Sequence, residues 1–198
     1  MAGPVFADKE LIERGSKVFR EVAGVGCQSC HGEFAEGDLG VGPFIRGATE
    51  GMIRAAIDAT NEMIVVKNVI TQEEIGAVAA YVNHLGSLQV ARTLAKRGRF
   101  LPGAFSTRPG TRLQLIIRNS GTKPQSFKSD NMGIESITIP GRSTGSFVWQ
   151  APGEEGQFSL YCTDCKLTDQ YFTIDVSNSA EEFHGTVPAQ KVTSDTTM

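Results

Sequence analysis

The chain has 198 residues, of which 40% are hydrophobic and 21% are charged, a composition that is ordinary for a globular protein. Residues 1–90 carry a net charge of −5 and residues 91–198 one of +2, which suggests two units with different surfaces. The sequence has no dense stripe of basic residues, which argues against nucleic-acid binding. No apolar run approaches the roughly 20 residues that a transmembrane helix needs, so no transmembrane segment is expected.

The first half of the chain has the periodicity of helices. Apolar residues recur at three- and four-residue spacing from about residue 8 to 22, and again from 71 to about 85. The run Thr71-Gln72-Glu73-Glu74 has the pattern of a capping box at the start of the second of these helices. A shorter helix is expected from Thr49 to about Ala59. The two long helices bracket the most informative motif of the chain.

That motif is Cys27-Gln28-Ser29-Cys30-His31, a C-x-x-C-H run typical of covalent attachment of c-type haem. Each thiol can form a thioether with a haem vinyl group, and the adjacent imidazole can then bind the iron as the proximal axial ligand. A thioredoxin-type dithiol would be expected in a βαβ context, which this region lacks. A zinc site would need a second ligand pair nearby, and the other two cysteines lie more than a hundred residues away.

Residues 5–88 resemble a small class I cytochrome c. Besides the motif, the resemblance rests on two aromatics and two glycines, one followed by proline: Gly15, Phe19, Gly42-Pro43 and Tyr81. In that family the first and last helices cross closely at the glycine. The resemblance implies an all-α domain with one haem c, in which the Pro43 carbonyl accepts a hydrogen bond from the proximal imidazole.

The resemblance also implies a distal iron ligand in the loop before the last helix, and Met63 is the residue placed there. His/Met ligation leaves no open iron position, which favours electron transfer over catalysis. Met52, His84 and an open or water-bound position are the alternatives. Arg46 and Arg54 either pair with haem propionates or are solvated.

The second half of the chain reads as short strands separated by turns. Strands are expected at 112–118, 136–139, 146–149, 158–161 and 171–176, a spacing that suggests a small antiparallel sandwich. Residues 99–176 resemble a cupredoxin-like domain of the EfeO type, as found with bacterial periplasmic iron-uptake proteins. The resemblance rests on several short runs: Phe100-Leu101-Pro102, Pro109-Gly110-Thr111, Lys123-Pro124-Gln125-Ser126-Phe127, Ile139-Pro140-Gly141, Pro152-Gly153 and Tyr161-Cys162-Thr163-Asp164-Cys165.

A type 1 copper site needs two His and one Cys, usually with a weak axial Met. By the resemblance, the ligand positions hold Gln125, Cys162, Cys165 and the Asp169-Gln170 pair, so three of the four ligands are replaced. A copper site is therefore not expected. Cys162 and Cys165 either form a disulfide, bind a soft metal such as Cu(I) together with Met132, or remain free thiols.

The predicted fold class is a two-domain chain, with an all-α class I cytochrome c followed by an all-β cupredoxin-like sandwich. The expected boundaries are 1–88 for the cytochrome domain, 89–98 for a linker, 99–177 for a cupredoxin-like domain without type 1 copper, and 178–198 for a polar tail. The tail is assigned on its composition, which is rich in Ser, Thr and acidic residues.

The predicted function is electron transfer by a periplasmic or otherwise exported protein, from which a signal peptide has been removed. One haem c is the expected cofactor, bound through Cys27, Cys30, His31 and Met63, with the sandwich as a docking or scaffold module. The chain is not expected to be an enzyme. Its expected partners are a redox donor and a redox acceptor protein, and the chain is a candidate subunit of a larger redox complex. The alternatives are copper or iron trafficking, and a thiol/disulfide or haem-based sensor.

Overall fold

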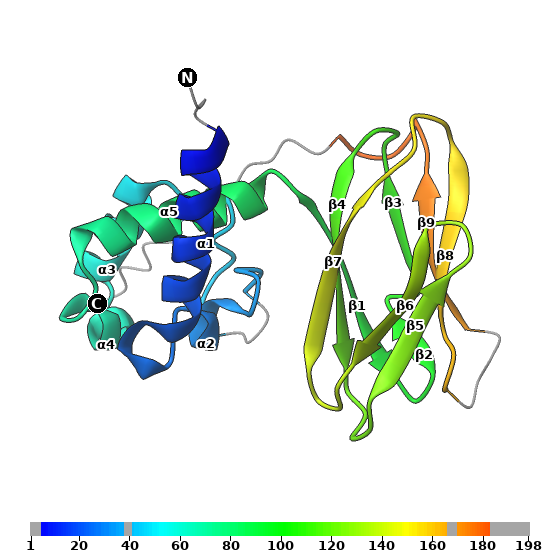
Figure 1. The fold of residues 1–198 in the computed structure, drawn as a ribbon, viewed down its shortest axis with the longest axis horizontal. Coiled ribbons are helices and arrows are strands. Elements are labelled where there is room, and N and C mark those ends of the chain that lie inside the picture. Colours follow the sequence, from blue (N-terminus) through cyan, green and yellow to red (C-terminus); the bar gives the residue numbers. More distant parts are fainter. Residues whose placement is uncertain (1–4, 38–40, 166–169, 183–198) are drawn as a thin grey trace, which may run out of the picture. The chain divides into compact units, whose positions relative to one another are not determined.

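The computed structural model describes residues 5–37, 41–165 and 170–182 (Figure 1). Contacts between residues divide the chain into two compact units that follow one another at Ser87 and Leu88. Helices form the first unit and two β sheets form the second, so the chain has a mixed α and β fold. The predicted fold class, an all-α cytochrome c followed by an all-β sandwich, was wrong for the chain as a whole. The chain belongs to a mixed α and β class instead, because a helix ending at Gly86 passes into a strand starting at Gln89 without an intervening linker.

Five α-helices and two short 3-10 helices make up the described part of the first unit. In chain order they are α1 (Val5–Glu21), η1 (Val22–Gly24), α2 (Gln28–His31), α3 (Glu50–Ala59), η2 (Asn61–Met63), α4 (Ile64–Lys67) and α5 (Gln72–Gly86). The capping box predicted at the start of α5 is confirmed, because the Thr71 hydroxyl accepts from Glu74 N and the Glu74 carboxylate accepts from Thr71 N. These bonds satisfy backbone donors that the first turn would leave unpaired.

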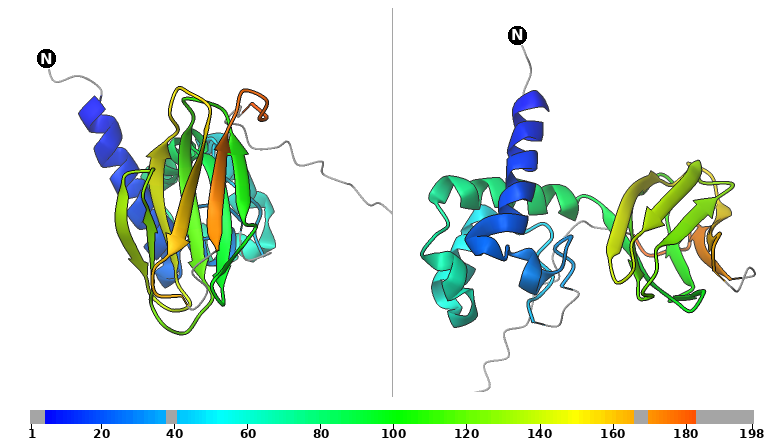
Figure 2. Two further views of the ribbon diagram at one scale, coloured as in Figure 1. Left: turned by 90° about the vertical axis from the view of Figure 1, so that its right-hand side faces the viewer. Right: turned by 60° about the horizontal axis from the view of Figure 1, so that its bottom comes forward.

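The helical unit is organised by the crossing of α1 and α5 (Figures 1 and 2). Gly15 lies at the crossing, where an added Cβ would overlap the backbone oxygen of Ala77. The rings of Phe19 and Tyr81 pack beside it with their centroids 5.5 Å apart. Glycine therefore lets the two backbones approach more closely than any other residue would allow.

The described part of the second unit contains nine strands. They are β1 (Gln89–Lys96), β2 (Arg99–Leu101), β3 (Ala104–Thr107), β4 (Arg112–Asn119), β5 (Gln125–Ser129), β6 (Ile134–Ile139), β7 (Thr144–Gln150), β8 (Gly156–Cys162) and β9 (Tyr171–Val176). One sheet has the order β2-β1-β4-β7 and the other β3-β9-β8-β5-β6. The pairs β1–β4 and β3–β9 are parallel, and the remaining pairs are antiparallel.

The segment 89–98, expected to be a linker, contains strand β1. Its alternate residues Ala91, Thr93 and Ala95 are buried, and β1 pairs along its length with β4. These small side chains give a weak strand signal, and the basic residues between them resemble a solvated connection. Residues 89–96 nevertheless form a strand, because pairing with β4 satisfies the hydrogen-bonding backbone groups of both strands.

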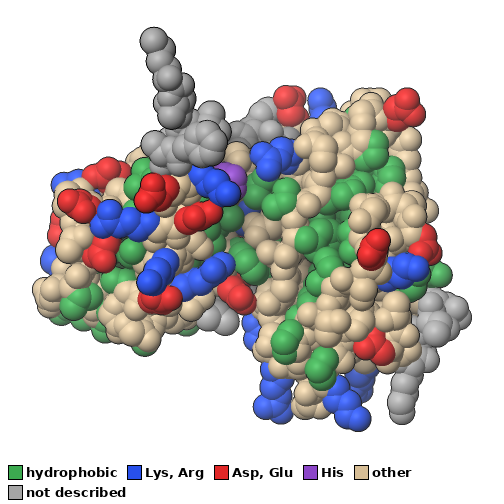
Figure 3. All heavy atoms as spheres, in the orientation of Figure 1, with side chains coloured by type: hydrophobic (Ala, Val, Ile, Leu, Met, Phe, Trp, Pro, Cys, Tyr) green, Lys and Arg blue, Asp and Glu red, His purple; other side chains and the backbone are tan. Residues whose placement is uncertain are grey.

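Charged side chains of both signs are interspersed over the face of the helical unit drawn in Figure 3. Neither sign forms a continuous patch there, which agrees with the absence of a basic stripe in the sequence. Among the residues that the structure describes, no helix has the length and apolar character needed to cross a membrane.

Candidate cofactor site

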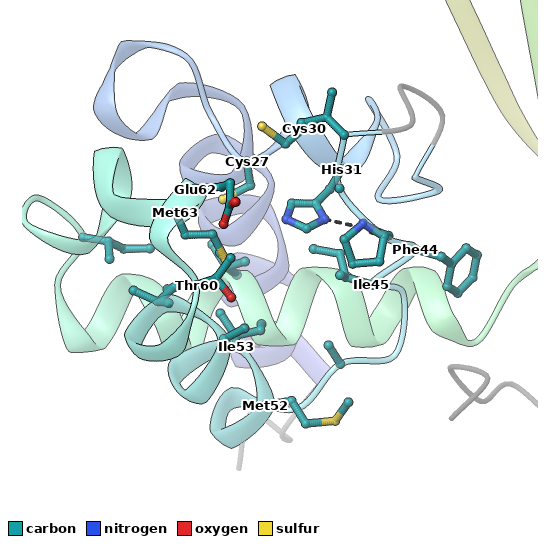
Figure 4. A pocket seen from close by; sticks show the side chains of 18 residues that line it. Cys27, Cys30, His31, Phe44, Ile45, Met52, Ile53, Thr60, Glu62 and Met63 are labelled. Atoms are coloured by element: carbon teal, nitrogen blue, oxygen red, sulfur yellow. Dashed lines mark hydrogen bonds between the residues drawn. The ribbon is translucent and has the colours of Figure 1, made fainter. Parts of the chain in front are cut away.

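The helical unit contains a cavity of about 660 Å³ (Figure 4). This volume lies within the range of about 300–1,000 Å³ that is usual for sites of small molecules and cofactors. Much of the wall is aliphatic, with Ile45, Ile53, Ile57, Ile70 and Val78 among the lining residues. The cavity is also lined by the five residues predicted to bind the haem or to support its ligand: Cys27, Cys30, His31, Pro43 and Met63.

A single helical turn brings the motif residues to this cavity. Cys27 is the N-cap residue of α2, and its carbonyl oxygen accepts from His31 N at 3.0 Å. Gly26, just before it, has a φ of 70°, and an added Cβ there would overlap the backbone of Arg20. The chain therefore needs glycine to turn from η1 into α2. The thiols of Cys27 and Cys30 are both free.

The His31 imidazole is buried and held in one orientation. Its Nδ1 donates to the Pro43 carbonyl oxygen over 2.9 Å, and the residue is only 7% exposed. A Cβ on Gly42 would lie 2.8 Å from Nδ1, so glycine is required beside the ring. Because a carbonyl oxygen only accepts, Nδ1 carries a proton, and in the neutral imidazole Nε2 then keeps the lone pair that can bind another partner.

The Cys27 thiol is protonated at neutral pH. Burial raises its pKa to about 11, because desolvation disfavours the thiolate. Redox-active dithiols depend instead on a thiolate whose pKa is lowered, to about 3.5–7.5. The environment of Cys27 therefore argues against thiol–disulfide exchange at this pair.

Two methionines line the cavity, and their positions differ. Met63 ends η2 and packs, partly buried, against the core of the helical unit. Met52 lies on α3 and is 51% exposed. In Figure 4 the Met63 side chain extends toward the middle of the cavity, whereas Met52 lies at its lower rim. His84 is not among the lining residues. Of the three candidate residues, Met63, which the sequence analysis favours over Met52 and His84, is best placed to share a bound group with His31.

Neither arginine proposed as a propionate partner lines the cavity. Arg46 is 1% exposed, and its guanidinium donates to the carbonyl oxygens of Phe34 and Leu85. Burial lowers its pKa to about 10, because desolvation disfavours the charged form. Arg46 thus ties the loop after α2 to the end of α5, a role that no sequence pattern signalled. Arg54 pairs on the surface with Glu50.

The second C-x-x-C pair lies in the β unit, and its chemistry is different. Cys162 ends β8, and a disulfide joins it to Cys165. Gln125, at the start of β5, holds the position where the cupredoxin resemblance would have a histidine. Its Oε1 atom is buried and has no hydrogen-bond partner. The disulfide is one of the three states that the sequence left open.

Met132, proposed as a companion of this pair, is buried in the same core cluster as Cys162. Its backbone N–H donates to the Ser129 hydroxyl, which donates to the carbonyl oxygen of Ser159. Of the other proposed ligand positions, Asp169 falls outside the described residues. Within the described ranges, no cluster of three or more His, Cys, Asp or Glu side chains is arranged to hold a metal ion.

No protein-family model matches the chain, and no curated protein matches it. Among solved structures, the apo form of a copper-binding protein is similar at 14% identity, covering 46% of this chain and 89% of that one, with a TM-score of 0.39. The metal-binding domain of a Streptococcus pneumoniae Cu(I)-exporting P-type ATPase matches at 16% identity, with coverages of 46% and 87% and a TM-score of 0.39. A purple cupredoxin from Nitrosopumilus maritimus matches at 17% identity, with coverages of 44% and 99% and a TM-score of 0.32.

The cofactor prediction was one haem c, with copper not expected. The dismissal of copper was wrong, because the structures similar to part of the chain are copper-binding proteins and a cupredoxin. The likeness is one of fold, to cupredoxin-like structures. Identities of 17% or less and TM-scores below 0.5 transfer no metal to any residue of this chain, so each site has to be judged on its own donors.

Proposed function

We propose that this chain is an electron-transfer protein that holds an iron porphyrin in the cavity of its helical unit. The observation that carries the proposal is the arrangement at α2. Two thiols and an imidazole line one cavity, and the imidazole has its Nδ1 bonded to Pro43 and its Nε2 lone pair available.

The residues present fit such a group in three respects. The aliphatic wall suits the faces of a large apolar ring, and the volume is sufficient for a cofactor. Cys27 and Cys30 are free and close to His31 in the same helical turn, as thioether attachment requires. Met63 supplies a soft thioether sulphur within the same cavity.

When bound, the group would supply a one-electron couple between ferrous and ferric iron. Cys27 and Cys30 would fix its position covalently. His31 and Met63 would hold the iron, and the hydrogen bond to Pro43 would set the donor strength of His31. Ile53 and Ile57 would keep water from the ring faces.

In this proposal the chain carries electrons and catalyses no reaction of its own. The β unit would act as a docking or scaffold module for a redox partner, which could belong to a larger redox complex. Export follows from the same proposal, because the thioether links of c-type haem are made in exported proteins. Copper or iron trafficking is the second candidate, and the cupredoxin-like fold of the β unit is the observation in its favour.

The test is to produce the full chain in cells with haem-attachment machinery and to compare Met63→Leu with Met52→Leu. The wild-type chain should keep haem after denaturation, seen as a mass increase, and should have a low-spin spectrum with a methionine–iron charge-transfer band. Met63→Leu should keep the covalent haem and lose that band, while Met52→Leu should keep both. Absence of covalent haem in the wild type would refute the proposal, and loss of the band in Met52→Leu alone would refute the assignment of Met63.

A further inference from the structure

The disulfide between Cys162 and Cys165 is placed unlike a structural cross-link. It joins residues three positions apart, with a Cα separation of 5.5 Å, so it closes a very short loop. Closing so short a loop removes little conformational entropy from the unfolded chain, so the disulfide stabilises the folded state only slightly by this effect. The pair nevertheless sits at the core, since Cys162 is 5% exposed and Cys165 packs against the same apolar cluster. A contribution to stability is therefore a weak explanation for the presence of the Cys162–Cys165 disulfide.

The loop between the two cysteines is held without the help of sulphur. Thr163 N donates to Ser126 O over 2.9 Å, and Ser126 N donates to Asp164 Oδ1 over 2.9 Å. The Thr163 hydroxyl also donates to Asp164 Oδ1, over 3.0 Å. Because these bonds connect the loop to β5, breaking the disulfide leaves both sulphur atoms near their present positions. The reduced pair is a preorganised dithiol.

A third donor group lies across from this loop in the strand register. Phe127 pairs with Cys162, and Gln125 lies two residues earlier on β5, on the same inward face as Phe127. This register sets Gln125 opposite the loop that ends in Cys165. Its Oε1 is buried without a hydrogen-bond partner, which is costly for an amide oxygen in a core. A cation at this end of the sandwich would satisfy that oxygen.

The donors do not fit type 1 copper. Such a site requires two imidazoles and a thiolate, and residues 88–165 and 170–182 of the β unit contain no histidine. A disulfide, moreover, offers no thiolate at all. Two thiolates with a weak oxygen neighbour suit a soft monovalent ion instead, and Cu(I) is the biological ion with that preference.

We propose that Cys162 and Cys165 form a redox-gated Cu(I) site, closed to metal as the disulfide and open as the dithiol. A dithiol reductant supplies two electrons and two protons, breaks the S–S bond and is itself converted to a disulfide. Cu(I) then binds the two sulphur atoms and displaces their two protons to solvent. Gln125 Oε1 lies beside the metal as a weak third donor. This site is independent of the function proposed for the helical unit.

The experiment is an anaerobic competition between the haem-loaded full chain and a chromogenic Cu(I) chelator, bicinchoninate. The chain is tested as isolated, and again after reduction and removal of the reductant. The reduced chain should take one equivalent more Cu(I) from the chelator than the oxidised chain. Gln125→Ala should keep that equivalent and bind it about tenfold more weakly.

The matched control is the double variant Cys162→Ser/Cys165→Ser, which keeps Cys27 and Cys30 unchanged. It should show no difference between the oxidised and reduced treatments. Equal Cu(I) uptake by the reduced wild type and the double variant would overturn the proposal, as would no uptake by the reduced wild type. If the double variant folds poorly, alkylation of the reduced wild type provides the same comparison, and uptake that survives alkylation overturns the site.

Discussion

The two Cys-x-x-Cys pairs of this chain share a spacing, and the structure gives them opposite surroundings. Cys27 and Cys30 lie at the start of a helical turn and are free thiols beside a buried imidazole. Cys162 and Cys165 lie at the end of a strand and form a disulfide. The Cys-x-x-Cys spacing by itself therefore only brings two sulphur atoms together. Their chemistry is decided by the next residue and by the cavity or core that they face.

The neighbouring groups explain the difference in physical terms. At the first pair, the helical turn directs both thiols and His31 into one cavity large enough for a cofactor. At the second pair, hydrogen bonds between Asp164, Thr163 and Ser126 hold a tight loop against the sandwich core. The first pair lines a cavity with room for a large ligand, whereas the second pair has its sulphur atoms bonded to each other.

The largest expected effect comes from removing each pair in turn. Cys27→Ser/Cys30→Ser should abolish covalent haem completely, because no thioether can then form. Cys162→Ser/Cys165→Ser should retain it in full. The measurement is the mass and the haem absorbance of the denatured protein. Equal haem retention in the two variants would contradict the different roles of the two pairs.

The next effect tests the packing that supports the first pair. Gly15→Ala should lower the free energy of unfolding by about 3 kcal/mol, because the new Cβ would overlap the backbone of Ala77 at the α1–α5 crossing. The measurement is denaturant unfolding followed by far-UV circular dichroism. Gly51→Ala on α3 is the matched control, since a Cβ there meets no atom within 4 Å. The control should stabilise the chain by up to about 1 kcal/mol, the helix preference of alanine over glycine. Similar losses in both variants would show that crowding at the crossing is not the cause.

Much of the candidate site was predictable because its signals are local. The motif from Cys27 to His31, the capping box at Thr71 and the apolar face of α5 are all patterns within one or two helical turns. Such patterns reflect short-range helix geometry, so they can be recognised from neighbouring residues in the sequence. The cavity also joins residues that the resemblance to class I cytochrome c had marked, such as Met63.

The rest depended on contacts between distant residues. Arg46 can be buried because its guanidinium donates to the carbonyl oxygens of Phe34 and Leu85, and no sequence pattern around residue 46 predicts these hydrogen bonds. Strand β1 was mistaken for a linker because its identity comes from pairing with β4. Register and pairing are long-range properties, so composition does not determine them.

A smaller effect concerns the protonation of the first pair. In haem-free protein, the pKa of Cys27 is raised to about 11 from the ordinary value of 9.0. The folded state therefore holds the thiol proton more tightly than the unfolded state does. Stability from this group is fully present below pH 9 and is lost as the pH rises from 9 to 11. The loss should be roughly 2 kcal/mol relative to Cys27→Ser, whose serine does not titrate in this range.

The measurement is urea unfolding of both haem-free proteins at a series of pH values, since the difference between them cancels the titration of other groups. The haem-loaded protein should show no such step, because a thioether does not titrate. A difference curve that is flat from pH 8 to 11 would mean that Cys27 is solvated in the haem-free protein.

The smallest effect distinguishes the second pair from a structural cross-link. Reducing the Cys162–Cys165 disulfide should lower the free energy of unfolding of the β unit by only about 1 kcal/mol, because the closed loop is short and hydrogen bonds to Ser126 hold it independently. Trp149 is the single tryptophan of the chain and packs on Phe158 within the β unit, so its fluorescence reports this unfolding. Urea titrations with and without reductant give the difference. A loss of several kcal/mol would mean that the disulfide is a principal support of the sandwich. Reducing it to bind a metal would then unfold the β unit.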